Sequence, residues 1–213
     1  MAAISVVETS LGPARMHEDA ARRPRLTLVL GHGAAGGVEA RDLVALAIAL
    51  PPRGISVIRI EQTWRVAGRK VAGPPAQLDQ AWTESLAALE LRSPLVVGGR
   101  SAGARVACRT ALNTDAIGVV ALAFPLHPPG RPERSRAGEL LGAGVPTVVV
   151  QGTRDSFGRP PEFPAGVDIR EVPDADHSFR VPKSSTIGQD AAYERAIGHV
   201  LDFLGEIVGM PGR

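Results

Sequence analysis

The segment Pro94-Leu-Val-Val-Gly-Gly-Arg-Ser-Ala-Gly103 joins an apolar run to an alanine-rich stretch with helical spacing. Its second half has the pattern G-x-S-x-G, which is typical of a strand that turns directly into a helix. Such a turn strains the serine backbone and brings the flanking residues close together, so glycine is needed at Gly99 and Gly103. The pattern predicts that the Ser101 hydroxyl is exposed above a helix N-terminus, whose N–H groups and dipole favour a developing oxyanion.

A tight turn with an incidental serine is the simpler interpretation, because the chain has 24 glycines among its 213 residues. The flanking sequence favours the strand–helix interpretation. Apolar runs of β type alternate with segments of helical spacing, and the middle runs are almost continuously apolar, as in strands buried on both faces. The runs are Leu26–Leu30, Ile55–Ile60, Leu95–Val97, Val119–Leu122, Val145–Val150 and Val167–Val172, and the helical segments are Val38–Leu50, Gln77–Leu91, Ala102–Leu112 and Gln189–Val208.

This alternation predicts an α/β fold with a central, mostly parallel sheet and helices on both faces. We expect one domain over residues 1–213, in which residues 1–25 form edge strands or a flexible N-terminal segment. Ile4–Val7 and Ala14–His17 are the candidate edge strands, antiparallel to their neighbours. Thr63–Pro75 and Phe124–Arg136 lack periodicity, and neither is long enough to form a cap domain.

A serine hydroxyl becomes a nucleophile when a base takes its proton and a carboxylate orients that base. In one common arrangement the order along the chain is serine, acid, histidine. His177 and His199 lie far enough along the chain, and His199 falls within the last helical segment. We therefore expect Ser101, Asp155 and His177 to be the catalytic residues, because Asp155 and His177 follow the last two β-type runs. Asp176 remains an alternative acid.

The glycine-rich segment Leu30-Gly-His-Gly-Ala-Ala-Gly-Gly37 follows the first of the six runs. A loop of this kind lets backbone N–H groups approach a reacting carbonyl, so the amides of Ala34 and Ala102 are the expected oxyanion-hole donors. The same loop also matches the G-x-G-x-x-G pattern of dinucleotide-binding proteins. Nucleotide binding is the rival hypothesis, and it leaves the serine, aspartate and histidine described above unexplained.

Four motifs together resemble the α/β-hydrolase superfamily: Gly31-His-Gly33, Gly99-Arg-Ser-Ala-Gly103, Gln151-Gly-Thr-Arg-Asp155 and Asp176-His-Ser-Phe179. The resemblance extends from about Leu26 to Val208. The Gly-Arg-Ser motif and Phe124-Pro-Leu-His-Pro-Pro-Gly130 are similar to a small branch that includes dienelactone-hydrolase-like proteins and proteins resembling testis-expressed protein 30. Dienelactone hydrolases carry a cysteine at the position of Ser101, so that particular substrate is not implied.

The resemblance implies an α/β-hydrolase fold without a separate cap domain and a serine hydrolase that cleaves an ester, thioester or related acyl bond. It implies no metal and no organic cofactor. The branch also contains scaffolding members, so a catalytically idle interaction module on the same fold is the alternative. A fluorophosphonate probe distinguishes the two, because it labels an activated serine.

Several other residues are candidates for lining a substrate pocket: His32, Trp64, Phe124 and His127. His127 borders the pocket or simply lies in a proline-stiffened loop. Arg100 is expected to form an ion pair beneath the site, and binding of an acidic substrate is its alternative role. Cys108 is expected to be a small buried apolar residue.

Composition limits the partners. The formal net charge is +2, aromatic residues make up 4% of the chain, and all 24 basic residues except Lys70 and Lys183 are scattered arginines. This pattern argues against nucleic-acid binding. The partner that the resemblance implies is a small-molecule acyl substrate, and the arginine bias favours a GC-rich genome and hence a bacterial source. We expect no membrane span and a cytoplasmic location, since no apolar run reaches about 18 residues and the N-terminus lacks a secretory signal. The oligomeric state does not follow from the sequence.

Overall fold

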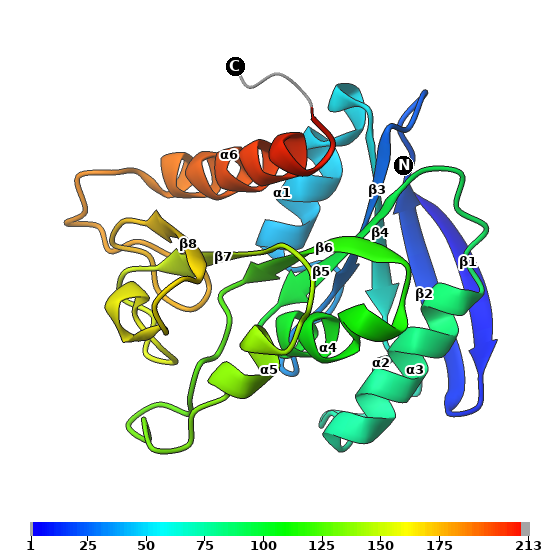
Figure 1. Cartoon of the computed structure of the whole chain (residues 1–213), viewed down its shortest axis with the longest axis horizontal. Helices are drawn as coiled ribbons and strands as arrows, with labels where there is room; N and C mark the ends of the chain where they lie inside the picture. The colour runs from blue at the N-terminus through cyan, green and yellow to red at the C-terminus, as the bar shows by residue number, and fades with distance from the viewer. Residues whose placement is uncertain (1, 210–213) are drawn as a thin grey trace.

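The computed structural model describes residues 2–209, which contain one eight-stranded sheet in the order β1-β2-β4-β3-β5-β6-β7-β8 (Figure 1). Strands β3 to β8 are parallel to one another, while β2 pairs antiparallel with both β1 and β4. The strands are β1 (Ala3–Thr9), β2 (Gly12–Asp19), β3 (Leu26–Gly31), β4 (Ile55–Glu61), β5 (Leu95–Arg100), β6 (Ala116–Leu122), β7 (Thr147–Gly152) and β8 (Asp168–Val172).

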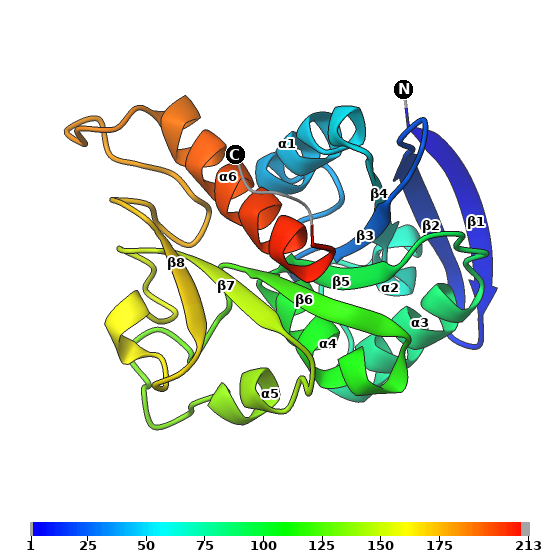
Figure 2. The ribbon, with the colours of Figure 1, turned by 45° about the horizontal axis from the view of Figure 1, so that its top comes forward.

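Helices cover both faces of the sheet (Figure 2). The α-helices are α1 (Arg41–Ala49), α2 (Thr63–Val66), α3 (Pro75–Ala87), α4 (Ala102–Thr110), α5 (Ala137–Leu141) and α6 (Gln189–Ile207). Three short 3₁₀ helices are η1 (Pro51–Arg53), η2 (Ala111–Asn113) and η3 (Pro160–Glu162). Helices α1 and α6 pack on one face and α3, α4 and α5 on the other, so the sheet separates two apolar clusters.

The central strands are apolar at successive positions because their side chains point alternately into the two clusters. In β3, Leu28 and Leu30 face α1 and α6, while Val29 faces the opposite cluster, and all three side chains are fully buried. The mostly parallel sheet with helices on both faces is therefore confirmed. No inserted domain interrupts the connection from β6 to β7, where residues 123–146 contain only the short α5.

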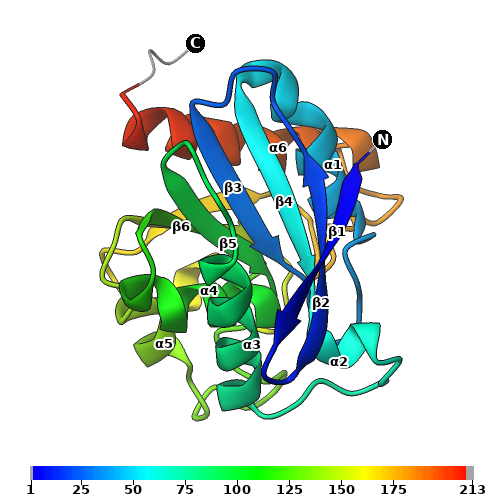
Figure 3. The ribbon, with the colours of Figure 1, turned by 90° about the vertical axis from the view of Figure 1, so that its right-hand side faces the viewer.

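The β1–β2 hairpin lies at one edge of the sheet (Figure 3), where the sequence predicts edge strands. Two short helices are additional findings. Helix α2 lies inside Thr63–Pro75, and α5 follows Phe124–Arg136, two segments without periodicity. Helices of four and five residues complete too few turns to produce a recognisable periodic pattern.

The strand order changes direction at β3. The chain runs from β3 to its neighbour β4 and then crosses to β5 on the other side of β3. The connections leaving the carboxyl ends of β3 and β5 therefore diverge, which is where ligands bind in open α/β sheets. Residues 32–37 follow β3, and Ser101 follows β5. Among the helices of residues 2–209, none is long and apolar enough to cross a membrane.

Candidate active site

Ser101 occupies the turn between β5 and α4. Its backbone has φ 52° and ψ −114°, a conformation that L-residues rarely adopt, and it is the N-cap residue of α4. The Ser101 N–H donates to the Leu122 carbonyl at 2.9 Å, and the Ser101 carbonyl accepts from the Arg105 N–H at 3.2 Å. These bonds fix the strained turn on β6 and α4, and they leave the half-buried hydroxyl free for side-chain chemistry.

Gly99 and Gly103 allow this turn to pack directly on β3. A Cβ atom added to either residue would overlap the backbone of Gly31. The two glycines of the G-x-S-x-G pattern are therefore required because the backbones of β5 and α4 both contact β3.

The structure brings together the three side chains expected to be catalytic. The Nε2 atom of His177 lies 2.9 Å from Ser101 Oγ, and its Nδ1 atom lies 2.8 Å from Asp155 Oδ2. Because a carboxylate only accepts hydrogen bonds, Nδ1 carries the imidazole proton and Nε2 is free to accept from the hydroxyl. The three residues follow β5, β7 and β8, whose carboxyl ends meet at one edge of the sheet. This arrangement can transfer a proton from serine to histidine.

Asp155 is completely buried, and three donors satisfy its carboxylate. Besides His177, the Gln151 side-chain amide donates to Oδ2 at 2.8 Å and the Phe157 backbone N–H donates to Oδ1 at 2.8 Å. A buried charge is tolerated when it is hydrogen-bonded in this way. Sequence reasoning assigned no role to Gln151, although a glutamine that ends the apolar run Val148-Val-Val was the available signal.

Phe157 also contacts the imidazole directly. Its half-buried ring stacks on His177 with 4.2 Å between ring centroids and an interplanar angle of 30°. The Phe157 carbonyl accepts from the His127 N–H at 3.0 Å. The segment after β7 therefore supports the histidine through both a carboxylate and an aromatic face.

The alternative acid, Asp176, has a different role. Its Oδ1 atom accepts from the backbone N–H groups of Ser178 at 2.7 Å and Arg180 at 2.9 Å. This is an Asx-type turn, which shapes the loop that carries His177. The carboxylate in hydrogen-bond contact with His177 belongs to Asp155.

The glycine-rich loop after β3 lies close to Ser101. A Cβ atom added to Gly33 would lie 3.5 Å from the Ser101 Cβ and 3.3 Å from Arg100 Nη1. Ala34 is exposed in the following turn, which the Gly36 N–H closes onto the Gly33 carbonyl at 3.2 Å. Ala102 is the first residue of α4, so its N–H has no acceptor within the helix.

The sequence places His32 among the pocket-lining residues, whereas the structure shows it as a buried support of the loop. Its Nδ1–H donates to the Gly33 carbonyl at 2.9 Å, and its Nε2 accepts from the Gln62 N–H at 3.2 Å. Burial lowers the pKa of His32, which keeps the ring neutral. Both ring nitrogens are occupied, and Trp64, which is also buried, lies 5.5 Å away between ring centroids. The His32 side chain therefore offers no free polar atom to a ligand.

Phe124 and His127 also differ from pocket-lining residues. Phe124 is fully buried and packs edge-on against Phe163. His127 is bonded to the Pro128 carbonyl at 2.9 Å and to Glu162 Oε2 at 2.8 Å. The Pro128 carbonyl and the Glu162 carboxylate raise the pKa of His127. Of its two expected roles, the structure supports the one in a stiffened loop.

Two further expectations concern Arg100 and Cys108. Arg100 forms an ion pair with Asp42 at 2.8 Å, as the sequence predicts. Cys108 is buried on α4, and burial raises the pKa of its thiol to about 12. No cluster of three or more potential metal-ligating side chains occurs in residues 2–209.

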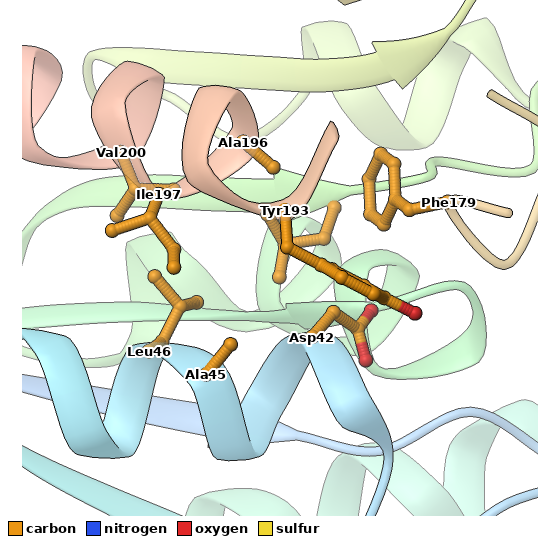
Figure 4. Close-up of a pocket in the computed structure, with 9 residues that line it drawn as sticks. Asp42, Ala45, Leu46, Phe179, Tyr193, Ala196, Ile197 and Val200 are labelled. Atoms are coloured by element: carbon orange, nitrogen blue, oxygen red, sulfur yellow. The ribbon is translucent and has the colours of Figure 1, made fainter. Parts of the chain in front are cut away.

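A small pocket lies between α1 and α6 (Figure 4). Apolar side chains of both helices line it, and the Asp42 carboxylate and the Tyr193 ring lie together at one end. Ser101, Asp155 and His177 are absent from its lining.

Comparisons with known proteins agree with this architecture. The family model described as "Alpha/beta hydrolase domain" matches residues 24–205. No curated protein sequence matches the chain significantly.

Solved structures give the same fold. An α/β serine hydrolase without a lid from Xanthomonas campestris is 18% identical, with a TM-score of 0.71 over 100% of this chain and 96% of that one. An α/β serine hydrolase homologue from Coxiella burnetii is 14% identical, with a TM-score of 0.72 over 96% of each chain. Est1E from Butyrivibrio proteoclasticus is 11% identical, with a TM-score of 0.71 over 95% of this chain and 99% of that one.

Proposed function

The chain belongs to the α/β hydrolase domain family, and on this basis we propose that it is a serine hydrolase that cleaves an ester, thioester or related acyl bond of a small substrate. The observation that carries the proposal is the position of the His177 ring, which contacts Ser101 Oγ with one nitrogen and Asp155 Oδ2 with the other. Nothing in an idle interaction module requires these three groups to be aligned.

In the proposed reaction, Ser101 Oγ attacks the acyl carbonyl while His177 Nε2 takes the hydroxyl proton. The imidazolium then protonates the leaving group, and an acyl-serine forms. In the second half, His177 Nε2 takes a proton from water while the water oxygen attacks the acyl-serine carbonyl. The imidazolium then returns the proton to Ser101 Oγ as the bond from Oγ to the acyl carbon breaks, and the acid is released. Asp155 holds the proton on Nδ1 and stabilises the imidazolium, because its carboxylate is buried beside that nitrogen.

The proposed oxyanion hole consists of the backbone N–H groups of Ala34 and Ala102. The position of Gly33 supports this assignment, because a Cβ atom added there would lie 3.5 Å from the Ser101 Cβ, which places the loop after β3 next to the serine. The Ala102 N–H lies at the start of α4, where the helix dipole favours negative charge. Loss of one such donor typically lowers kcat by about 10²–10³-fold.

The test combines a covalent probe with substrates of graded size. We expect a fluorophosphonate to label wild-type protein at Ser101, and a series of p-nitrophenyl esters of increasing chain length to reveal turnover. Ser101→Ala should lose both labelling and turnover. Ser178→Ala is the matched control, because the Ser178 side chain is exposed one residue from His177 and makes no hydrogen bond of its own in residues 2–209.

Two results would contradict the proposal. One is Ser101→Ala with wild-type turnover in a preparation free of other esterases. The other is wild-type protein that neither reacts with the probe nor hydrolyses any ester, which would favour the idle interaction module.

A further inference from the structure

Arg100 is the last residue of β5 and immediately precedes the proposed nucleophile. Its side chain is only 15% exposed. The guanidinium donates through Nε to Asp42 Oδ2 at 2.8 Å and through Nη2 to the backbone carbonyl of His177 at 2.6 Å. One side chain from the strand that ends at Ser101 therefore reaches both helix α1 and the loop of the proposed base.

The bond to the His177 carbonyl joins the loop of the proposed base to the turn that carries Ser101. The loop of residues 173–181 is held by its own turns, above all by the Asp176 carboxylate, and by Phe179 in the core. Two further bonds come from outside the loop: the Arg154 N–H donates to the Ala175 carbonyl at 2.9 Å, and the Gln189 side-chain amide donates to the Phe179 carbonyl at 2.7 Å. These contacts do not connect the loop to the strand–helix turn of residues 98–103. Within residues 2–209, two hydrogen bonds make that connection: the imidazole–hydroxyl contact of the proposed triad and the Arg100 bond.

We propose that Arg100 is a positioning residue, which holds the main chain of His177 at the distance where its ring meets Ser101 Oγ. The inference rests on the proposed function above. Two consecutive residues then fix both ends of the base: Ser101 contacts the side chain and Arg100 contacts the backbone. Proton transfer depends steeply on this distance, and a misplacement of about 1 Å can cost about 10²-fold in rate.

Asp42 makes the guanidinium a rigid support. Its carboxylate is buried in the first turn of α1, where Oδ1 accepts from the Leu43 N–H at 3.0 Å and Oδ2 accepts from Arg100. Figure 4 shows this carboxylate at the polar end of the pocket between α1 and α6. Because the guanidinium is planar, fixing Nε on Asp42 also fixes the direction of Nη2. The ammonium of a lysine could keep the ion pair but could not hold both acceptors in this geometry.

The competing explanation is that Arg100 only stabilises the fold through its ion pair. Arg59 on β4 provides a matched control for that explanation. It donates through Nη1 to the Val38 carbonyl at 2.9 Å and through Nη2 to Asp19 Oδ2 at 2.9 Å, and its side chain is 11% exposed. Arg59 thus holds one carboxylate and one backbone carbonyl, as Arg100 does, without contacting the proposed triad.

The test compares Arg100→Lys with Arg59→Lys, each measured for thermal unfolding, kcat, KM and the rate of fluorophosphonate labelling. We expect Arg100→Lys to lower kcat and the labelling rate by about 10- to 100-fold with little change in KM. Arg59→Lys should keep the wild-type kcat, even if its melting temperature falls equally. A folded Arg100→Lys protein with kcat within twofold of wild type would overturn the inference.

A second variant covers the case in which Arg100→Lys does not fold. The double replacement Arg100→Met with Asp42→Leu removes both charges together, and apolar replacements of this kind are often neutral for stability. We expect this protein to fold and to show the same loss of kcat, since no donor faces the His177 carbonyl. Wild-type turnover by the folded double variant would also overturn the inference.

A third readout does not depend on turnover. The Nδ1 proton of His177 should give a downfield NMR resonance in wild type and in Arg59→Lys, and it should shift or broaden in Arg100→Lys and in the double variant. If wild-type protein hydrolyses no ester, the proposed function fails, while this resonance still tests the positioning role. An unchanged resonance in a folded Arg100 variant would refute that role.

Discussion

Replacing Asp155 with asparagine tests whether the site needs a carboxylate that accepts on both oxygens, because the two side chains have almost the same shape. The Asp155 carboxylate faces donors on both oxygens: Oδ1 accepts from the Phe157 N–H, and Oδ2 accepts from His177 and Gln151. An asparagine has one accepting oxygen and one NH₂ group, so it cannot satisfy both sides.

Each orientation of the amide has a predictable cost. With its oxygen toward His177, the NH₂ group meets the Phe157 N–H, and one buried donor is left unsatisfied. With its oxygen toward Phe157, the NH₂ group faces both Gln151 and His177 Nδ1. The imidazole can relieve its own conflict by moving its proton to Nε2, where it can no longer accept from Ser101. One unsatisfied donor costs about 1–3 kcal/mol, or a few degrees in melting temperature for a chain of this size.

We therefore expect Asp155→Asn to fold and to lose about 10³–10⁴-fold in kcat, since the same replacement in a serine protease triad costs about 10⁴-fold through the wrong tautomer. The assay is steady-state hydrolysis of a p-nitrophenyl ester together with the rate of fluorophosphonate labelling. Asp176→Asn is the control. Its amide oxygen can still accept from Ser178 and Arg180, so kcat should stay within a few-fold of wild type. Equal losses in the two variants, or a kcat for Asp155→Asn within tenfold of wild type, would refute the reasoning.

Three more predictions follow from packing and protonation. Gly103→Ala should yield little folded protein in an expression and circular dichroism assay, because the new methyl group would overlap the β3 backbone. The Cys108 thiol, with a pKa of about 12, should stay unreactive toward iodoacetamide at pH 8 until the chain unfolds, and prompt native labelling would contradict its burial. The Pro128 carbonyl and Glu162 raise the pKa of His127 above its ordinary value of 6.5. The protonated imidazole therefore stabilises the folded state fully below pH 6.5, and this contribution to the free energy of unfolding is lost as the pH rises through the pKa of His127 in the folded state. His127→Gln should therefore lower the melting temperature more at pH 5.5 than at pH 9, and equal shifts at the two pH values would contradict this.

The nucleophile turn could be predicted because all of its determinants are local. Gly99, Ser101 and Gly103 lie within five residues, directly between a buried strand and a helix. Asp155 and His177 could be predicted from chain order and from the rule that the carboxyl ends of parallel strands share one edge. For these residues it was sufficient to know which strand each one follows.

The direction of a side chain beyond a strand end could not be predicted in the same way. His32 follows β3, as a pocket residue would, but its ring turns inward because the Gln62 N–H and the Trp64 ring, both from the segment after β4, enclose it. The Glu162 partner of His127 lies 35 residues away along the chain. Contacts of this kind depend on loop paths, and neither periodicity nor motif spacing encodes them.

The three aligned side chains follow three different strands, and the last of these strands is β8, a five-residue strand at the edge of the sheet with a single neighbour. Fraying of that edge would carry the imidazole away from its carboxylate while the centre of the sheet stays intact. Recovery of turnover during refolding should consequently lag behind recovery of secondary structure. The rate at which turnover recovers would then report when β8 pairs with the rest of the sheet.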